Sequence, residues 1–432
     1  MRASTTNRVP PKGWTHRNLG DLVVLSNDSG IPTESPRFPF VGMEHIEAQT
    51  GRLLAYGDPA DYRSSSYIVD SNQVLYGRLR PYLNKVFVPK ERCYASREFI
   101  PMILTEEINQ AFLLYLLRSS SFVEFAISLN AGDRPRVKWP QIAFFEISLP
   151  PLDEQLKIVE ILEEQLSRLD AALASVLAVR EKAERLRRSL LHVAFTGAHI
   201  GSDAAAGVIP LGWSKVRLGD CLEKLKSGKL AERGWSPQCL NHPATDESSW
   251  AVLKTTAVQM GDFWASFNKE LPNTLEPKIG LEVNDGDFLM TTTGPRNRCG
   301  IVCLVKQTRK KLIFSGKILR FRANASRLMP GWLMYLMMSP DIQKAFDELK
   351  VGTSDSSVSI GNQQVLDLVI PIAPLVDQQK TIDILEAQFS RIDASIAMAT
   401  AIENKASAMR RSLLHSAFSG NLTKEWREGA HV

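Results

Sequence analysis

Basic side chains set beside small polar and aromatic ones are the residues of this sequence best suited to chemistry. Arginine and lysine neutralise phosphates and can bind guanine edges, and asparagine can bind adenine, so such loops suit a nucleic acid. A solvated surface carries the same residue types, and spacing alone does not distinguish base contacts from phosphate contacts. The candidates in the first half are Arg78, Arg80, Tyr82, Asn84, Lys85, Arg134, Arg136 and Lys138. Those in the second half are Lys224, Lys226, Lys229, Arg296, Asn297, Arg298, Lys317, Arg320 and Arg322.

Motifs for catalysis and for cofactors are absent from the sequence. The stretch Ser227-Gly228-Lys229 lacks the first glycine of a phosphate loop, and Leu230 replaces the hydroxyl that would hold magnesium. The sequence contains no dinucleotide fingerprint, no amino-methyltransferase motif that holds a flipped base, and no Cys/His metal cluster. We therefore expect no catalytic residue, metal or cofactor in this chain. An enzyme with an unusual site is the alternative, which activity of the chain alone would reveal.

Composition indicates a soluble protein of several domains. The chain has 432 residues, 44% of them hydrophobic and 23% charged, with a net charge of +5. No apolar run is long enough to span a membrane, and the N-terminus lacks an apolar signal-peptide core, so we expect a cytoplasmic protein. The five cysteines form no paired framework and are expected to be reduced thiols. The mild positive charge permits a polyanionic partner without requiring one.

The elements that position the basic loops are organised by an internal duplication. Residues 151–197 align without a gap on residues 374–420, and 25 of the 47 positions are identical. Both copies end in R-R-S-L-L-H-x-A-F-x-G, and each begins with a proline. The openings Gly13-Trp14 and Gly212-Trp213, each followed by Leu-Gly-Asp, extend the repeat to the modules upstream. Each half therefore combines a globular module with a repeated segment.

The repeated segments have the heptad spacing of long coiled-coil helices. Each is about 60 Å long at 1.5 Å per residue, and the obvious partner of one is the other. Two amphipathic helices on separate cores are the alternative. A local slip in the heptad is expected around Val179 and Ile402. The first seam comprises Leu162, Leu166, Leu169, Leu173, Val176, Val179, Ala183, Leu186 and Leu190. The second comprises Leu385, Phe389, Ile392, Ile396, Ala399, Ile402, Ala406, Met409 and Leu413.

These patterns predict a complete domain layout. The predicted parts are a disordered N-terminus (1–10), a first module (11–149), a long helix (150–197), a linker (198–209), a second module (210–372), a second long helix (373–420) and a tail (421–432). In the first module we expect strands at 66–69, 74–76, 85–88, 99–104 and 143–149, helical periodicity over 108–128 and a loop at 130–136. In the second module we expect strands at 287–290, 300–305, 312–314, 317–322 and 366–372, a helix at 332–338 and a loop at 351–357.

With these motifs in view, the chain resembles the specificity subunits of type I restriction–modification systems over nearly its whole length. The resemblance depends on P-P-L-D-E-Q-L-K-I at 150–158, on its second copy A-P-L-V-D-Q-Q-K-T, and on the shared helix ends. V-L-Y-G-R-L-R-P-Y-L-N-K at 74–85 and G-D-F-L-M-T-T-T-G-P-R-N-R-C-G at 286–300 add to it. The second copy departs from the pattern at Ala373 and Asp377, which puts only details of the helix start in doubt.

The resemblance implies an α+β fold with pseudo-twofold symmetry. Two duplicated α/β target-recognition domains would be separated by two long antiparallel helices that form a coiled coil. Each domain would read one half of a bipartite site in double-stranded DNA. Two modification subunits would bind and methylate adenine N6, and two restriction subunits could join them. S-adenosylmethionine, ATP and magnesium would then belong to the partner subunits, and this chain would do no chemistry. A coiled-coil adaptor whose modules bind protein instead of DNA is the alternative.

Overall fold

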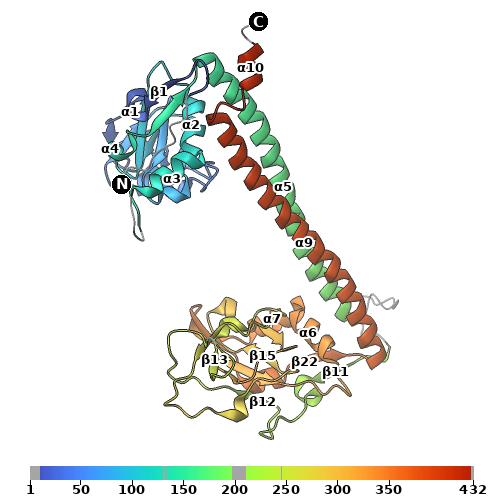
Figure 1. Ribbon diagram of the computed structural model, residues 1–432. Coiled ribbons are helices and arrows are strands. Elements are labelled where there is room, and N and C mark those ends of the chain that lie inside the picture. Colours follow the sequence, from blue (N-terminus) through green and yellow to red (C-terminus); the bar gives the residue numbers. More distant parts are fainter. Residues whose placement is uncertain (1–9, 130–131, 133, 197–210, 245, 430–432) are drawn as a thin grey trace. The chain divides into compact units, whose positions relative to one another are not determined.

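The structure is a computed structural model that describes residues 10–129, 132, 134–196, 211–244 and 246–429 (Figure 1). The predicted disordered N-terminus, except residue 10, and the predicted linker lie outside these residues. The chain divides into two compact units, residues 1–177 with 399–432 (the first unit) and residues 178–398 (the second unit). Each unit contains one module and one half of each long helix. The predicted α+β fold with duplicated modules and two long helices is confirmed.

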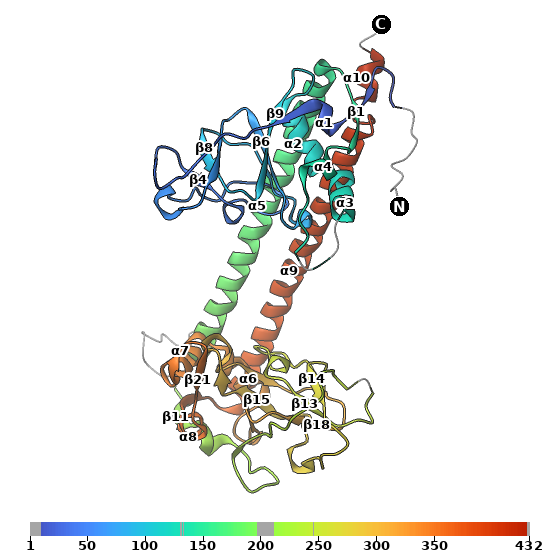
Figure 2. The same ribbon diagram turned by 90° about the vertical axis from the view of Figure 1, so that its left-hand side faces the viewer.

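The first module is built from small sheets covered by short helices (Figure 2). One four-stranded sheet has the order β2-β9-β6-β7, a second has the order β3-β5-β8-β4, and β1 pairs antiparallel with β10. The strands are β1 (Thr15–Asn18), β2 (Val23–Leu25), β3 (Ser29–Gly30), β4 (Phe40–Val41), β5 (Ser66–Val69), β6 (Gln73–Gly77), β7 (Val86–Phe87), β8 (Cys93–Ala95), β9 (Phe99–Leu104) and β10 (Glu146–Leu149). The helices are α1 (Leu19–Leu22), α2 (Gln110–Arg118), α3 (Ser120–Ser128) and α4 (Trp139–Ile142).

The second module repeats this plan with additions. Its four-stranded sheet β12-β19-β15-β17 corresponds to β2-β9-β6-β7, and the pair β11–β22 corresponds to β1–β10. The strands are β11 (Ser214–Arg217), β12 (Ala231–Arg233), β13 (Ala251–Leu253), β14 (Asn268–Glu270), β15 (Phe288–Thr291), β16 (Thr293–Gly294), β17 (Val302–Leu304), β18 (Leu312–Phe314), β19 (Ile318–Phe321), β20 (Val351–Ser354), β21 (Ser357–Ser359) and β22 (Val369–Ile372). The helices are α6 (Pro330–Met338), α7 (Pro340–Glu348) and α8 (Asn362–Leu366).

Two segments differ from the sequence prediction. The helical run over 108–128 is broken at Ser119, which ends α2 in extended backbone and caps α3 by accepting a hydrogen bond from the Phe122 amide. Ser339 breaks α6 from α7 in the same way. The segment 351–357, predicted as a loop, forms most of the hairpin β20–β21.

The helices α5 (Leu152–Thr196) and α9 (Leu375–Phe418) pair within each unit (Figures 1 and 2). In the first unit, Leu162 and Leu166 share a buried cluster with Leu414 and Ala417, and Leu169 and Leu413 pack against it. In the second unit, Ala183 and Leu191 share a cluster with Leu385, Phe389 and Ile392, against which Leu190 and Ile396 pack. The start of each helix therefore lies beside the end of the other, so the pairing is antiparallel. Leu173 is half-buried.

The seam departs from strict heptads where the slip is expected. Val179 and Leu186 are 45% and 46% exposed, and the matching residues Ile402 and Met409 are 42% and 50% exposed. The buried residues are instead Val176, Ala183 and Leu191, so the face of α5 that packs against α9 shifts by one residue. Four predicted seam positions therefore face solvent, because two successive steps of three move them off the packed face.

One ion pair occurs at the same place in both units. Arg410 on α9 pairs with Asp170 on α5 in the first unit, and Arg187 on α5 pairs with Asp393 on α9 in the second. Each arginine and each aspartate matches its counterpart at the repeat offset. The two units thus use one contact with the roles of the helices exchanged.

A buried glutamine fixes the start of each long helix. Gln155 accepts a hydrogen bond from the Asn109 amide at 2.8 Å and donates to the Glu107 and Pro150 carbonyls, both at 2.9 Å. Gln378 bonds in the same way to the Met329 amide and to the carbonyls of Arg327 and Ala373. Both side chains are fully buried, so their repeated presence in the sequence reflects one packing solution used twice.

The segment after residue 420, predicted only as a tail, contains a helix, α10 (Lys424–Gly429). It is held at Glu154, which is 2% exposed. One carboxylate oxygen accepts from Thr423 Oγ1 at 2.6 Å and from Arg427 Nε at 3.0 Å, and the other accepts from Trp14 Nε1 at 2.9 Å. The chain's first module, first long helix and C-terminal segment therefore meet at one buried carboxylate.

No single helix among the described residues has the length and apolar character of a membrane span. The helices α2 and α3, which meet at a 59° bend, reach that length and apolar character only when they are taken together. Their apolar side chains pack into the first module's core.

Candidate nucleic-acid interface

Two loops of the first module bring most of the predicted basic residues together. Loop A (residues 78–85) follows β6, and loop B (residues 134–138) precedes α4. Leu79 and Arg136 form an antiparallel bridge, the Arg80 amide donates to the Pro135 carbonyl at 2.7 Å, and the Val137 amide donates to the Arg78 carbonyl at 3.0 Å. The loops thus form one continuous surface, although they are some fifty residues apart in sequence.

Loop A has an unusual backbone. Arg80 and Asn84 both adopt left-handed conformations, with φ of 54° and 49°, on either side of the 3₁₀ turn Pro81–Leu83. Gln49, also left-handed at φ 67°, braces this turn through its amide and its side chain, which donate to the Leu83 and Tyr82 carbonyls. Non-glycine residues with positive φ are costly and gather at functional sites. Tyr82, at the crest of the turn, is 44% exposed.

Three of the predicted residues serve to hold the loops. The Asn84 side chain is 7% exposed and donates to the Arg118 carbonyl at 3.1 Å, which removes it from contact with a ligand. Lys85 Nζ donates to the Met43 carbonyl at 2.6 Å, and burial lowers the pKa of this lysine against the opposing influence of Glu44. Arg136 pairs with Glu98 at 2.5 Å. We therefore assign Asn84, Lys85 and Arg136 to loop structure.

The other predicted basic residues of loops A and B are open to a partner. Arg134 and Lys138 are exposed on loop B. The side chains of Arg78 and Arg80 are half-buried, and neither forms a hydrogen bond or ion pair with another residue that the structure describes. Together with Tyr82 they form a basic and aromatic surface on a rigid loop, which is the composition expected for contacts to phosphates and bases.

The second module has the corresponding loop over residues 292–299. Thr293 and Gly294 form β16 and pair with Ser359 and Val358 of β21, just as loop A pairs with loop B. The Ile360 amide donates to the Thr292 carbonyl at 2.9 Å, which matches the bond between Val137 and Arg78. The two modules therefore share a backbone arrangement whose side chains differ.

The basic residues of this second loop are engaged within the module. Arg296 pairs with Asp355 at 2.9 Å and with Asp347 at 3.1 Å, and the hydrogen bonds that it donates to these carboxylates raise its pKa. Arg298 donates to Gln259 and to the carbonyls of Thr255 and Val258. Arg296 and Arg298 are therefore both occupied within the module, whereas Asn297 is exposed.

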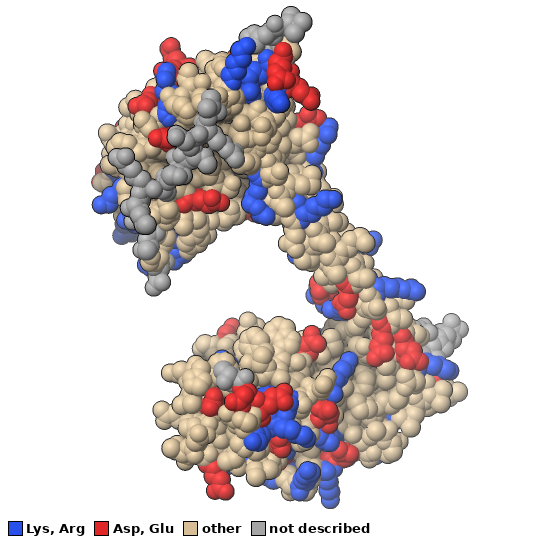
Figure 3. All heavy atoms as spheres, in the orientation of Figure 1, with Lys and Arg blue, Asp and Glu red and all other residues tan. Residues whose placement is uncertain are grey.

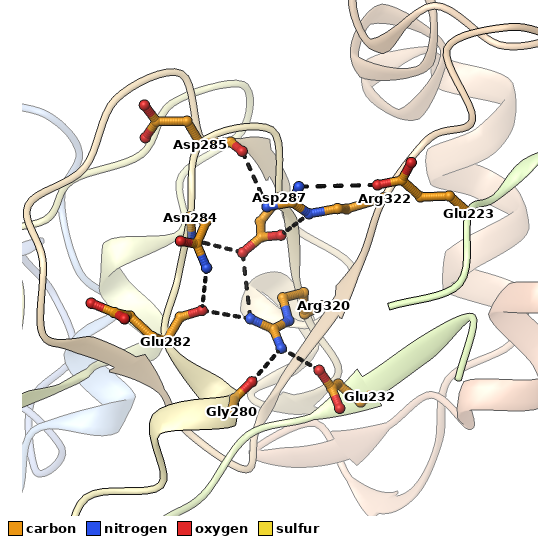
Figure 4. Close-up of polar contacts among 9 residues, drawn as sticks. All are labelled: Glu223, Glu232, Gly280, Glu282, Asn284, Asp285, Asp287, Arg320 and Arg322. Carbon is orange, nitrogen blue, oxygen red and sulfur yellow. Dashed lines mark hydrogen bonds and ion pairs between the residues drawn. The ribbon is translucent and has the colours of Figure 1, made fainter. Parts of the chain in front are cut away.

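A cleft of about 630 Å³ gathers Lys224, Lys226, Arg320 and Arg322 in the second module. Arg320 lies at its floor, 5% exposed, and pairs with Glu232 and with Asp287, the latter at 3.5 Å (Figure 4). Its guanidinium also donates to the carbonyls of Glu282 at 2.6 Å and Gly280 at 2.8 Å. Arg322 pairs with Asp287 at 2.5 Å. The prediction that Arg320 contacts DNA is corrected, because its charge is buried and already paired.

The cleft is mixed in charge and not basic overall. Five basic residues line it, against four acidic ones: Lys224, Lys226, Lys310, Arg320 and Arg322, and Glu223, Glu282, Asp285 and Asp287. Figure 3 shows the same mixture on the visible face of this unit, where blue and red side chains alternate. Lys229 and Lys317 are exposed outside the lining of the cleft. The cleft is thus a weaker phosphate site than the loops of the first module.

Sequence reasoning missed the residues that shape these surfaces. Gln49 braces loop A, Glu98 holds loop B, and Glu232 and Asp287 neutralise Arg320. None carries a local signal, since each partner lies more than thirty residues away. The cysteines offer no site: four are buried, Cys239 is half-buried, and burial raises the pKa of Cys93 and of Cys303 to about 12.

Comparison with solved structures supports the fold. A chain from a study of complex assembly and conformational transition of the type I R-M system matches with a TM-score of 0.72 at 20% identity, covering 96% of this chain and all of that one. The HsdS subunit from Thermoanaerobacter tengcongensis matches with a TM-score of 0.50, also at 20% identity, over 96% of this chain and 99% of that subunit. At this identity the likeness establishes the fold alone.

Sequence comparison establishes the family. Residues 11–175 match the type I restriction modification DNA specificity domain. The specificity subunit of the Escherichia coli type I restriction enzyme EcoEI is 31% identical, over 89% of this chain and 79% of that subunit. The chain belongs to the type I restriction enzyme specificity subunits. The specificity subunit of MjaVIII from Methanocaldococcus jannaschii is 23% identical, over 86% of this chain and 84% of its own length. As a specificity subunit, this protein recognises DNA and works with the other subunits of a restriction–modification system.

Proposed function

We propose that this specificity subunit directs its complex to a bipartite DNA sequence, of which each module reads one half. The observation that carries the proposal is that the two modules share a scaffold but not its surface. Loop A and its counterpart make equivalent backbone bonds to loop B and to β21. Arg78, Arg80 and Tyr82 are replaced there by Thr292, Gly294 and Arg296. Two modules that read different half-sites need a shared loop backbone that carries different side chains.

The long helices offer matched surfaces for two copies of one partner. Val179 and Leu186 in the second unit are exposed to the same degree as Ile402 and Met409 in the first. Exposed apolar side chains on a helix face favour docking of another protein. Two equivalent patches suit two modification subunits, one for each half-site, which would methylate adenine N6. Restriction subunits would join through them, and S-adenosylmethionine, ATP and magnesium would bind to those partners.

Exchange of one module tests this function. Residues 11–149 are replaced by the corresponding module of the EcoEI specificity subunit, and the chimaera is expressed with the modification subunits of the native system. Methylome sequencing should then show one new half-site, while the other half-site and the gap stay unchanged, because the second module and both helices are retained. A change in both half-sites, or in neither, would contradict the proposal.

DNA binding by the purified chain separates this function from that of a protein-binding adaptor. A reader of DNA should bind duplex with an affinity that falls steeply as salt rises, because phosphate contacts release counterions. Binding that is absent at every salt concentration, both alone and with the modification subunits, would favour the adaptor.

A further inference from the structure

Arg80 in loop A adopts a left-handed backbone conformation that is energetically unfavourable for a residue other than glycine. Arg80 has φ 54° and ψ 69°, a conformation that glycine adopts freely and that a β-carbon disfavours. The conformation is fixed from both sides, because the Arg80 amide donates to Pro135 and its carbonyl accepts from the Leu83 amide at 2.8 Å. A residue other than glycine at such a position needs a reason that lies in its side chain.

The second module shows that the scaffold accepts glycine here. Tyr76 pairs with Val86 in the first module as Met290 pairs with Val302 in the second, and this register aligns Arg80 with Gly294. Gly294 also has a positive φ, of 149°, and a β-carbon built on it would meet nothing within 4 Å. The second module thus forms its corresponding turn with glycine and no side chain, although φ there differs from that of Arg80.

The Arg80 side chain has no internal role that would explain its presence. It forms no hydrogen bond or ion pair with another residue in the described part of the chain, and its Nε atom is buried without a partner. Arg136 of loop B and Lys85 of loop A, by contrast, are both bound to acceptors within the protein. A half-buried guanidinium with unused donors is poised for an external acceptor.

We propose that Arg80 is a specificity-determining residue of the first module, which reads the acceptor edge of a guanine in the major groove. This inference rests on the proposed function. A phosphate contact requires only a positive charge on a flexible stem, whereas a bidentate base contact requires a planar guanidinium held at a fixed angle. The pinned backbone and the partly enclosed side chain supply that angle. Arg78, equally unengaged and two residues earlier in the loop, would contact the adjoining backbone phosphate.

Two substitutions separate base reading from phosphate binding. Arg80→Gly removes the side chain and suits the left-handed backbone, while Arg80→Lys keeps the charge but loses the planar fork. The native site is first defined by methylome sequencing. Binding of the full chain with its modification subunits is then measured on duplexes in which each base pair of that site is changed in turn.

We expect both variants to lose discrimination at one G·C pair of a single half-site, by about 5- to 150-fold, the range for a bidentate contact. Arg80→Lys should keep most of its affinity for non-specific duplex and most of its salt dependence. Arg80→Gly should melt at or above the wild-type temperature, because glycine relieves the backbone. Lys311→Gly, which replaces the left-handed basic residue of the other unit (φ 61°), is the matched control and should keep that discrimination.

Several outcomes would overturn the inference. Retained base preference in Arg80→Gly would do so, as would a loss that is uniform over all duplexes and rescued by lysine, which indicates a phosphate contact. A lowered melting temperature of Arg80→Gly would show that the side chain holds the loop. If the wild-type complex itself shows no sequence preference, the proposed function fails and not merely the role of Arg80.

Discussion

At the scale of single residues, Arg320 is a charged side chain that stabilises the fold and does not face the candidate DNA interface. Its guanidinium is buried with Glu232 and Asp287, and Arg322 shares the Asp287 carboxylate (Figure 4). Removal of one member of a buried network leaves the others without compensation. The buried network joins β12 and β19 with the segment that precedes β15, so its integrity should govern the stability of the second module.

Arg320→Ala should therefore destabilise the second module strongly. The expected loss is about 3–5 kcal/mol in the free energy of unfolding, because the Glu232 carboxylate keeps its charge but loses its partner in the interior. Thermal unfolding of the full chain measures this loss. The control is Lys317→Ala, at the exposed residue that directly precedes β19. An unchanged melting transition combined with weaker DNA binding would restore Arg320 to the interface.

Sequence reasoning located the basic loops but could not sort their members. Arg80, Asn84 and Lys85 lie within six residues, and the type of each fits a DNA contact equally well. Their different roles depend on acceptors far away in the chain, the Arg118 carbonyl for Asn84 and the Met43 carbonyl for Lys85. Such partners become visible only when the strands are assembled, so burial could not be predicted from composition or spacing.

At the scale of elements, the N-terminal ends of α5 and α9 are held by different sets of contacts. Gln155 and Gln378 make equivalent bonds in both copies, whereas Glu154 has the shorter Asp377 as its counterpart. Of these two carboxylates, Glu154 is the one that bonds to the described part of the C-terminal segment, through Thr423 and Arg427. The Glu154 carboxylate thus contacts both Trp14 and Arg427 of α10.

Glu154→Gln should release α10 without unfolding the first module. The substitution keeps the shape but removes the charge that Arg427 pairs with, and a charge-assisted bond contributes about 1.5–3 kcal/mol. Hydrogen exchange in residues 421–429 should accelerate by about ten- to a hundredfold, while β6 and β9 stay protected. Asp377→Asn is the matched control in the other copy. Unaltered exchange in the segment would mean that α10 is held by something other than Glu154.

The long helices were the elements most open to prediction, because a repeated seam of apolar residues is a local signal. Their bounds differ by only a few residues from those expected, at 152–196 and 375–418. The slip was anticipated, but which side chains it would expose was not. Val179 and Ile402 face solvent because the partner helix continues along the row that contains Val176 and Ala183, a choice made by packing between helices.

At the scale of the whole molecule, the proposed function makes the paired helices a spacer between two readers. Each of α5 and α9 begins in one unit and ends in the other, and the ion pairs Arg410–Asp170 and Arg187–Asp393 fix their register in both. Such a spacer can be lengthened only if both helices are extended by the same number of residues and the apolar seam keeps its heptad phase. Seven residues preserve the heptad phase, whereas three or four would shift it.

Insertion of one heptad after Val176 and one after Ala399, which are matched positions, should lengthen both helices by about 10.5 Å at 1.5 Å per residue. At about 3.4 Å per base pair, the unread gap of the methylated motif should grow by about three base pairs, with both half-sites unchanged. Methylome sequencing of cells that carry the variant and the native modification subunits reads this directly. A heptad in α5 alone is the control, and it should impair folding, because the two ion pairs can no longer form together. A stable double-insertion variant whose gap is unaltered would show that the helices do not set the spacing.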